Sequence, residues 1–136
     1  MTFSHSIKSF DELTNHELYN MLRLRNEVFV VEQNCPYQDL DNKDQKGFHL
    51  LYYVDNELAG VTRLLPKGIS YEEISIGRVV IARSHRGLGL GKKLMEASIA
   101  GCEEKFGKAP IKISAQYHLS KFYQSLGFAE QGEVYD

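Results

Sequence analysis

One segment near the middle of the chain restricts the fold more than any other. Residues 74–82 read Ile-Ser-Ile-Gly-Arg-Val-Val-Ile-Ala, and the last four are apolar. Such a run is typical of a strand covered on both faces, in the middle of a sheet. A turn with three glycines in five residues follows, and then a helix to about Phe106 with apolar residues on one face. We therefore expect an α/β protein built around this strand.

The segments on either side predict a mixed sheet with helices on both faces. Thr14 and Glu17 have the spacing of a capping box, and apolar residues at intervals of three and four extend that helix to about Val28. The polar turn at 55–57 joins two β-rich runs as a hairpin. The other expected elements are strands at 1–10, 49–54, 58–65, 111–114 and 128–135 and a helix at 118–126. The order β-α-β-β-β-α-β-α-β, without repeat or linker, predicts a single domain over residues 1–136.

Charge and composition exclude several classes of protein. The 16 basic and 18 acidic side chains give a net charge of −2, so the chain lacks the positive field that nucleic acid binding requires. No apolar run approaches the roughly 20 residues that cross a bilayer, and the N-terminus lacks a signal-peptide core. We expect a cytoplasmic protein with no membrane partner. Cys35 and Cys102 lie far apart, outside any CxxC pair, so both are expected to be free thiols.

A polar loop at residues 34–47 carries three aspartates but does not predict a metal site. An EF-hand would need an oxygen ligand where Lys43 stands and a glycine where Asp44 stands. We therefore expect a solvated loop and no metal. Its carboxylates, Asp39, Asp41 and Asp44, are candidates for attracting a cationic substrate.

The glycine-rich turn Arg86–Gly91, named the phosphate cradle below, is a candidate anion-binding site. Its glycines expose backbone N–H groups at a helix N-terminus, where the helix dipole favours negative charge. Arg86, Lys92 and Lys93 add full positive charges around it. The glycine spacing fits neither a Walker A loop nor a Rossmann GxGxxG motif. A diphosphate fits such a turn, and an ordinary helix start is the alternative.

Four stretches of sequence resemble the GCN5-related N-acetyltransferase (GNAT) family. Residues 86–91 match its Q/R-x-x-G-x-G/A signature, and Phe122–Phe128 resembles its (L/F)Y-x-x-x-GF ending. Val28–Tyr37 and Gln116–Leu119 are similar to the ElaA-type branch of that family. The resemblance covers essentially the whole chain. It implies the GNAT-like acyl-CoA N-acyltransferase fold and transfer of an acetyl group from acetyl-CoA to an amine acceptor.

The resemblance also implies roles for particular residues. The backbone of strand residues 79–81 would pair with the pantetheine arm, and the phosphate cradle would hold the pyrophosphate. Tyr123 falls on the position that donates a proton to the departing CoA thiolate in many members. The implied cofactor contacts are Val79, Val80, Ile81, Arg86, Gly87, Leu88, Gly89, Leu90, Gly91 and Lys92.

A general base is also required by the chemistry. An amine with a pKa near 10.4 is protonated at pH 7, and removing its proton costs roughly 4.6 kcal/mol before any bond forms. As the neutral amine attacks the thioester, charge builds on the carbonyl oxygen, where a fixed backbone N–H can stabilise it. We rank Glu32 and His118 first as base candidates, with His49, Glu72 and Glu73 as the others.

The end of the chain departs from the family pattern. Family members commonly carry two strands after the GF turn, whereas this chain ends eight residues past Phe128. Either the chain is a shortened form, or the final strand is missing or comes from a neighbouring subunit, in which case a homodimer would cover the open sheet edge. A non-catalytic acyl-CoA-binding or sensing module is therefore an alternative to the enzyme. A structural partner protein, whose glycines only form a turn, is the third.

Overall fold

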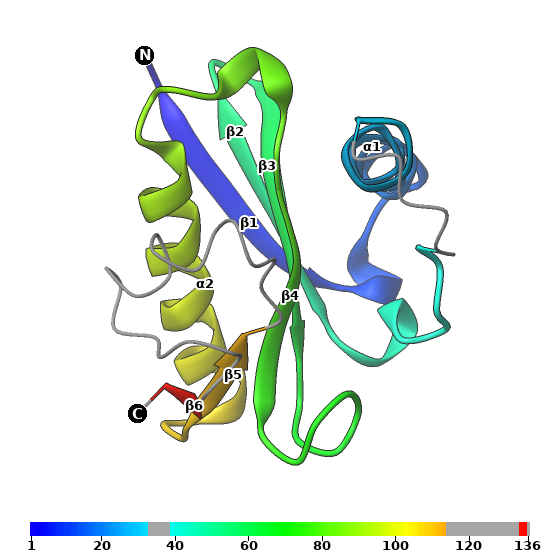
Figure 1. Ribbon diagram of the computed structural model, residues 1–136, viewed down its shortest axis with the longest axis vertical. Helices are drawn as coiled ribbons and strands as arrows, with labels where there is room; N and C mark the ends of the chain where they lie inside the picture. The colour runs from blue at the N-terminus through cyan, green and yellow to red at the C-terminus, as the bar shows by residue number, and fades with distance from the viewer. Residues whose placement is uncertain (33–38, 114–133, 136) are drawn as a thin grey trace.

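The computed structural model describes residues 1–32, 39–113, 134 and 135. This part of the chain forms a six-stranded sheet in the order β1-β2-β3-β4-β5-β6, with α1 on one face and α2 on the other (Figure 1). The strands are β1 (Phe3–Ser9), β2 (Phe48–Val54), β3 (Glu57–Leu65), β4 (Ile74–Ile81), β5 (Ile111–Ile113) and β6 (Val134–Tyr135). The helices are α1 (Asn15–Arg25) and α2 (Leu90–Phe106), and the shorter helical segments are η1 (Phe10–Glu12), η2 (Asn26–Glu32), η3 (Asp44–Lys46) and η4 (Arg83–His85). The predicted mixed α/β sheet is confirmed.

The sheet is antiparallel except at one junction. Every neighbouring pair runs antiparallel apart from β4 and β5, which run parallel. The β2–β3 hairpin turns at Asp55 and Asn56, with φ of +50° and +68°, as a type I′ turn requires. The predicted edge strand, hairpin and central strand are all confirmed. The predicted helix at 118–126 lies outside the described residues, as does most of the last predicted strand.

Helix α1 forms one layer of the core. Thr14 Oγ accepts the Glu17 N–H, and Glu17 accepts the Thr14 N–H, so the predicted capping box is confirmed. After Arg25 the chain continues as the π-type turn η2. Met21 and Leu24 belong to a buried cluster on this face of the sheet that also contains Val80 of β4.

Helix α2 forms the layer on the opposite face. Its buried residues include Leu94, Met95, Ser98 and Cys102, as the helical spacing predicts. The Ser98 and Thr62 hydroxyls lie 2.7 Å apart, which satisfies both inside an otherwise apolar layer. Cys102 is a free thiol, and burial raises its pKa to about 12. Cys35 lies outside the described residues. Within the described ranges, no helix is both long and apolar enough to cross a bilayer.

Candidate functional site

The phosphate cradle lies between the end of β4 and the start of α2. Gly87 and Gly89 have φ of +86° and +70°, a left-handed region that favours glycine. A Cβ at either glycine would meet no atom within 4 Å, so the space above both is open. Gly89 is the N-cap of α2, and no side chain caps the helix start there. The first N–H groups of α2 are therefore not capped by a side chain, at the positive end of the helix dipole.

The cationic side chains around the cradle differ in their contacts. The Arg86 guanidinium donates from Nε and Nη2 to the Ile81 carbonyl, at 3.1 and 3.0 Å, and so reaches back over the end of β4. Lys92 is exposed in the first turn of α2. Lys93 Nζ lies 5.0 Å from the centre of the Phe3 ring. Both lysines are thus exposed, and the Lys93 ammonium lies over the Phe3 ring of β1.

Strand β4 carries a β-bulge in the middle of its length. Val80 pairs with Val61, and Gly77 pairs with Arg63. Between these two pairs β4 contains two residues and β3 contains one, which defines the bulge. Arg78 has φ of +51°, which is strained for a residue with a long side chain. The bulge directs Val79 toward the α2 layer and Val80 toward the α1 layer.

The bulge coincides with the point where β4 separates from β5. Their pairing covers only residues 74–76 of β4 and 111–113 of β5. Figure 1 shows β5 beside the beginning of β4 only. Residues 77–81 therefore have no partner in the described part of β5. This stretch includes residues 79–81, which the resemblance assigns to the pantetheine arm.

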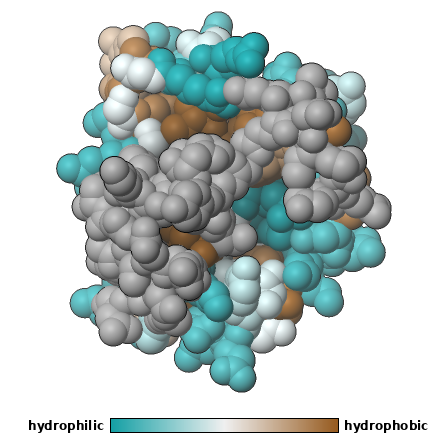
Figure 2. Space-filling model, in the orientation of Figure 1, coloured by the Kyte–Doolittle hydropathy of each residue, from teal (hydrophilic) through white to brown (hydrophobic). Residues whose placement is uncertain are grey.

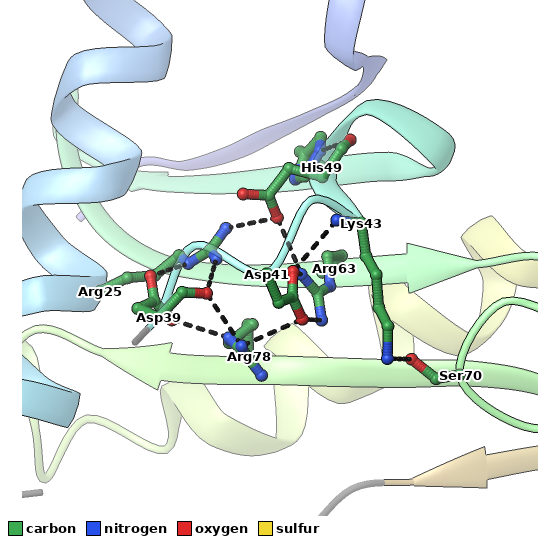
Figure 3. Close-up of polar contacts among 9 residues, drawn as sticks. Arg25, Asp39, Asp41, Lys43, His49, Arg63, Ser70 and Arg78 are labelled. Carbon is green, nitrogen blue, oxygen red and sulfur yellow. Dashed lines mark hydrogen bonds and ion pairs between the residues drawn. The ribbon is translucent and has the colours of Figure 1, made fainter. Parts of the chain in front are cut away.

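Beside the bulge, on the α1 side, three arginines and three aspartates form a network that we name the Arg–Asp cluster (Figure 3). Its ion pairs measure 2.7 to 3.2 Å and join Arg25 to Asp39 and Asp44, Arg63 to Asp41 and Asp44, and Arg78 to Asp39 and Asp41. Arg25 is 1% exposed and Arg63 is 3% exposed. The cluster ties residues 39–44 to α1, β3 and β4. It also holds the side chain of Arg78, the residue with the strained backbone, through ion pairs with two carboxylates.

This network corrects the prediction for the aspartate loop. The sequence predicts that residues 39, 41 and 44 are solvated and attract a cation, but each carboxylate is already paired with two arginines. Burial alone would raise the pKa of Asp44, but the charges and hydrogen bonds of Arg25 and Arg63 outweigh it and lower that pKa. Asp41 behaves alike: burial raises its pKa, and Arg63, Lys43 N–H and Arg78 lower it well below the usual range.

His49 is buried beneath the same cluster and is not a candidate base. It is 0% exposed, and its Nε2 lies 2.8 Å from the Asp44 carbonyl oxygen, so Nε2–H is the donor. Its Nδ1 is buried without a partner among the described residues. Burial lowers the pKa of His49 despite the bond to the Asp44 carbonyl. The prediction of His49 as a candidate base is therefore wrong, because its side chain is fully buried.

Protonation of His49 should make stability depend on pH. Its folded pKa lies below the unfolded value near 6.5, so the neutral form stabilises the fold above pH 6.5, and this contribution is lost as the pH falls below it. We expect unfolding free energy to fall between pH 6.5 and 5.5 by up to about 1.4 kcal/mol per unit. Urea unfolding of His49→Gln should lack that slope, whereas the exposed His16→Gln should keep it. An unchanged slope in His49→Gln would contradict the assignment.

The structure says less about the other predicted catalytic residues. Glu32 is the last residue of η2, and π-type turns occur often at functional sites. Tyr123 and His118 lie outside the described residues. Glu73 directly precedes β4, about 16 Å from the bulge at roughly 3.3 Å per residue, and Glu72 lies one residue farther away. Neither glutamate is positioned by β4 itself to reach an amine at the bulge.

Sequence reasoning missed the arginines of the cluster. Arg25 occupies a position on the apolar stripe of α1, Arg63 lies inside the β-rich run of β3, and Arg78 lies inside β4. A charged residue at an inward position is rarely left unpaired, so it signals a buried carboxylate partner. The nearby aspartate loop supplies those partners.

Hollows on the α1 side lie at both ends of β4. A pocket of about 980 Å³ lies between α1, the start of β3 and η4, next to the segment that leads into the cradle. A smaller one of about 180 Å³ lies beside the bulge. In Figure 2, hydrophilic residues gather at the top, where the β4–α2 loop lies, with apolar surface directly beneath them. The polar loop before α2 thus lies next to apolar surface.

These features define an α/β domain in which a glycine-rich turn at a helix start follows a bulged central strand, and this strand pairs with the described part of β5 only at residues 74–76. The model of the acetyltransferase (GNAT) domain family matches residues 11–136. Protein ElaA of Escherichia coli K12 is 42% identical over 127 residues, 92% of this chain and 83% of ElaA. The chain therefore belongs to the GNAT acetyltransferase family, and the resemblance to the ElaA-type branch is confirmed.

Solved structures agree with this assignment. The crystal structure of E. coli ElaA matches with a TM-score of 0.89 and 38% identity, over 99% of this chain and 93% of that one. An acyl-CoA N-acyltransferase from Pseudomonas aeruginosa matches with a TM-score of 0.88 and 40% identity, over 98% of this chain and 93% of that one. The fold is thus the acyl-CoA N-acyltransferase fold, and the chain is an acyltransferase of this class.

Proposed function

We propose that this protein is an acetyl-CoA-dependent N-acetyltransferase that transfers an acetyl group to a primary amine of a small molecule or peptide. The observation that carries the proposal is that an open phosphate cradle lies next to residues 77–81 of β4, which pair with β3 on one side and have no partner in the described part of β5 on the other. The cradle holds the CoA pyrophosphate, and the strand edge holds the pantetheine arm by backbone hydrogen bonds. The thioester then lies near the bulge.

The bulge supplies the electrostatic part of the mechanism. Attack by the amine on the thioester carbon turns the carbonyl oxygen into an oxyanion, and collapse of this intermediate expels the CoA thiolate. A backbone N–H on the unpaired side of residues 77–81 donates to that oxygen. Cluster contacts from Asp39 and Asp41 to Arg78 fix the strand at this point, so the donor is held in place before the reaction.

Three proton transfers complete the reaction. The acceptor ammonium loses one proton before attack, and Glu32 and His118 are the proposed bases or ends of a water chain to one. Tyr123 then donates a proton to the departing thiolate, and the nitrogen of the tetrahedral intermediate gives up its second proton, which restores the Tyr123 phenol and leaves a neutral amide. We further propose a single domain over residues 1–136, cytoplasmic location and a homodimer as the form in which the sheet edge is covered.

The test is the release of free CoA thiol in the presence of amines. A broad panel of primary amines and peptides should accelerate thiol release above the hydrolysis of acetyl-CoA alone. Tyr123→Phe should lower kcat about 100-fold at unchanged CoA affinity, because it removes only the acid that protonates the thiolate. Tyr19→Phe is the control, since Tyr19 is 71% exposed on α1.

Two outcomes would count against the proposal. If CoA binds but no amine in the panel accelerates thiol release, the protein is an acyl-CoA-binding module rather than an enzyme. If calorimetry detects no CoA binding at all, the phosphate cradle is only a turn.

A further inference from the structure

The smaller pocket on the α1 side, named the β4 pocket, adjoins the point where the chemistry is proposed to occur. It has a volume of about 180 Å³, enough for a carboxylate or phosphate group. Gly77 and Arg78 of the bulge line it, together with Ser75 and Ile76 just before them. The remaining lining residues are Asp41, Lys43, Arg63, Leu65, Ser70 and Tyr71. An acceptor that reaches the bulge from the α1 side therefore passes this pocket.

The charge around the β4 pocket is positive. Within the Arg–Asp cluster three arginines face three aspartates, so those charges cancel. Lys43 adds a positive charge, and its Nζ contacts the neutral Ser70 hydroxyl at 3.1 Å (Figure 3). Lys112 adds another, with its Nζ 4.5 Å from the centre of the Tyr71 ring. Neither lysine pairs with a carboxylate within the described part of the chain. The pocket therefore favours an anion.

The wall of the β4 pocket also contains an unsatisfied donor. Arg63 is buried, and its Nε–H has no hydrogen-bond partner among the described residues, although its Nη atoms bind Asp41 and Asp44. This Nε–H is itself fully buried, so it adds no contact that the structure places in the pocket. The excess positive charge of Lys43 and Lys112 is what an oxyanion in the pocket matches.

From this arrangement we infer that the β4 pocket binds an anionic group of the acyl acceptor, either a carboxylate or a phosphate. The inference rests on the proposed function, because it takes the reacting amine to lie at the unpaired edge of β4. Pocket residues Ser75 and Gly77 precede Val79 by two to four residues, which is roughly 7–13 Å along a strand. The acceptor is thus a primary amine whose anionic group lies several bonds away from the nitrogen.

Matched acceptors test the charge requirement directly. With acetyl-CoA as donor, 6-aminohexanoate should give a kcat/KM at least about 10-fold higher than 6-aminohexanol, and the difference should lie in KM. The reason is that the two acceptors share the amine and chain length and differ in the group that enters the pocket. A parallel assay with 5-aminopentylphosphonate shows whether the pocket prefers a carboxylate or a phosphate-like group.

A lysine variant then assigns the preference to the pocket. Lys43→Gln should bring the ratio between the two acceptors down about 10-fold, through a higher KM for 6-aminohexanoate. Lys46→Gln is the matched control, because Lys46 is exposed on η3 three residues away and does not line the pocket.

The outcomes separate this inference from the proposed function. Equal kcat/KM for the two acceptors, or turnover with other amines but with neither of these, would overturn the inference that the acceptor carries an anionic group. Either result would leave the proposed N-acetyltransferase function standing. Loss of the preference in both lysine variants would overturn the assignment to the β4 pocket. Absence of turnover with every amine in the broad panel would instead overturn the proposed function.

Discussion

Replacing Gly89 with glutamate should weaken CoA binding about 1000-fold. Gly89 is the N-cap of α2 with φ of +70°, and the space above it is open. A glutamate there puts a negative charge against the pyrophosphate and distorts the turn that presents the α2 N–H groups. Loss of two charge-assisted hydrogen bonds, at about 2 kcal/mol each, corresponds to about that factor. Calorimetry with CoA measures it.

Gly107→Glu is the matched control for Gly89→Glu. Gly107 lies at the other end of α2 and also has positive φ, and a Cβ at this position would likewise meet no atom within 4 Å. Both variants carry backbone strain, so both should melt at a lower temperature. The strain is larger in Gly107→Glu, because Gly107 has ψ of +168°, a conformation that is essentially restricted to glycine, whereas Gly89 has ψ of +17°. Only Gly89→Glu should lose CoA. Equal CoA affinity in the two variants would show that the cofactor does not use the cradle.

Removing the Asp44 carboxylate should cost about 3 kcal/mol of unfolding free energy. In Asp44→Ala, the buried Arg25 and Arg63 each lose a partner at 3.0 and 2.9 Å. Breaking a buried ion pair from one side leaves a charge without compensation, which typically costs 3–5 kcal/mol. We expect the lower end, because Arg25 keeps Asp39 and Arg63 keeps Asp41. Urea unfolding at pH 7.5 measures the loss.

Glu27→Ala provides the comparison for Asp44→Ala. Glu27 pairs with Arg23 at 3.0 Å on the outer face of the α1–η2 segment, where their side chains are 56% and 52% exposed. Exposed pairs of this kind contribute about 0.3–0.5 kcal/mol. A loss in Asp44→Ala no larger than in Glu27→Ala would mean that the Arg–Asp cluster does not stabilise the fold.

Local patterns in the sequence were sufficient for most of the fold. The capping box of α1, the Asp55-Asn56 turn and the apolar run of β4 each depend on neighbouring residues, and each prediction is confirmed. The glycine-rich turn before α2 was equally predictable as a turn, because positive φ at Gly87 and Gly89 and a helix start directly after them are local properties. That it binds phosphate stays a prediction.

The Arg–Asp cluster was not readable in this way, because its partners come from distant parts of the chain. Arg63 and Asp41 lie 22 residues apart, and Arg78 and Asp39 lie 39 apart. Seen locally, the aspartates resemble a solvated loop, and only the fold brings the arginines against them. The bulge was missed for a similar reason, since it is a mismatch in register between β3 and β4 rather than a feature of either strand.

The two faces of β4 pack in separate layers, which bears on how relatives of this protein can change their acceptors. Val79 packs in the layer of α2, and Val80 packs in the layer of α1. Substitutions in one layer act largely independently of the other when they share no contacts. Under the proposed function and the inferred acceptor pocket, a lineage can therefore acquire a new acceptor by exchanging a few side chains around Lys43 and Tyr71 without altering the turn at the start of α2.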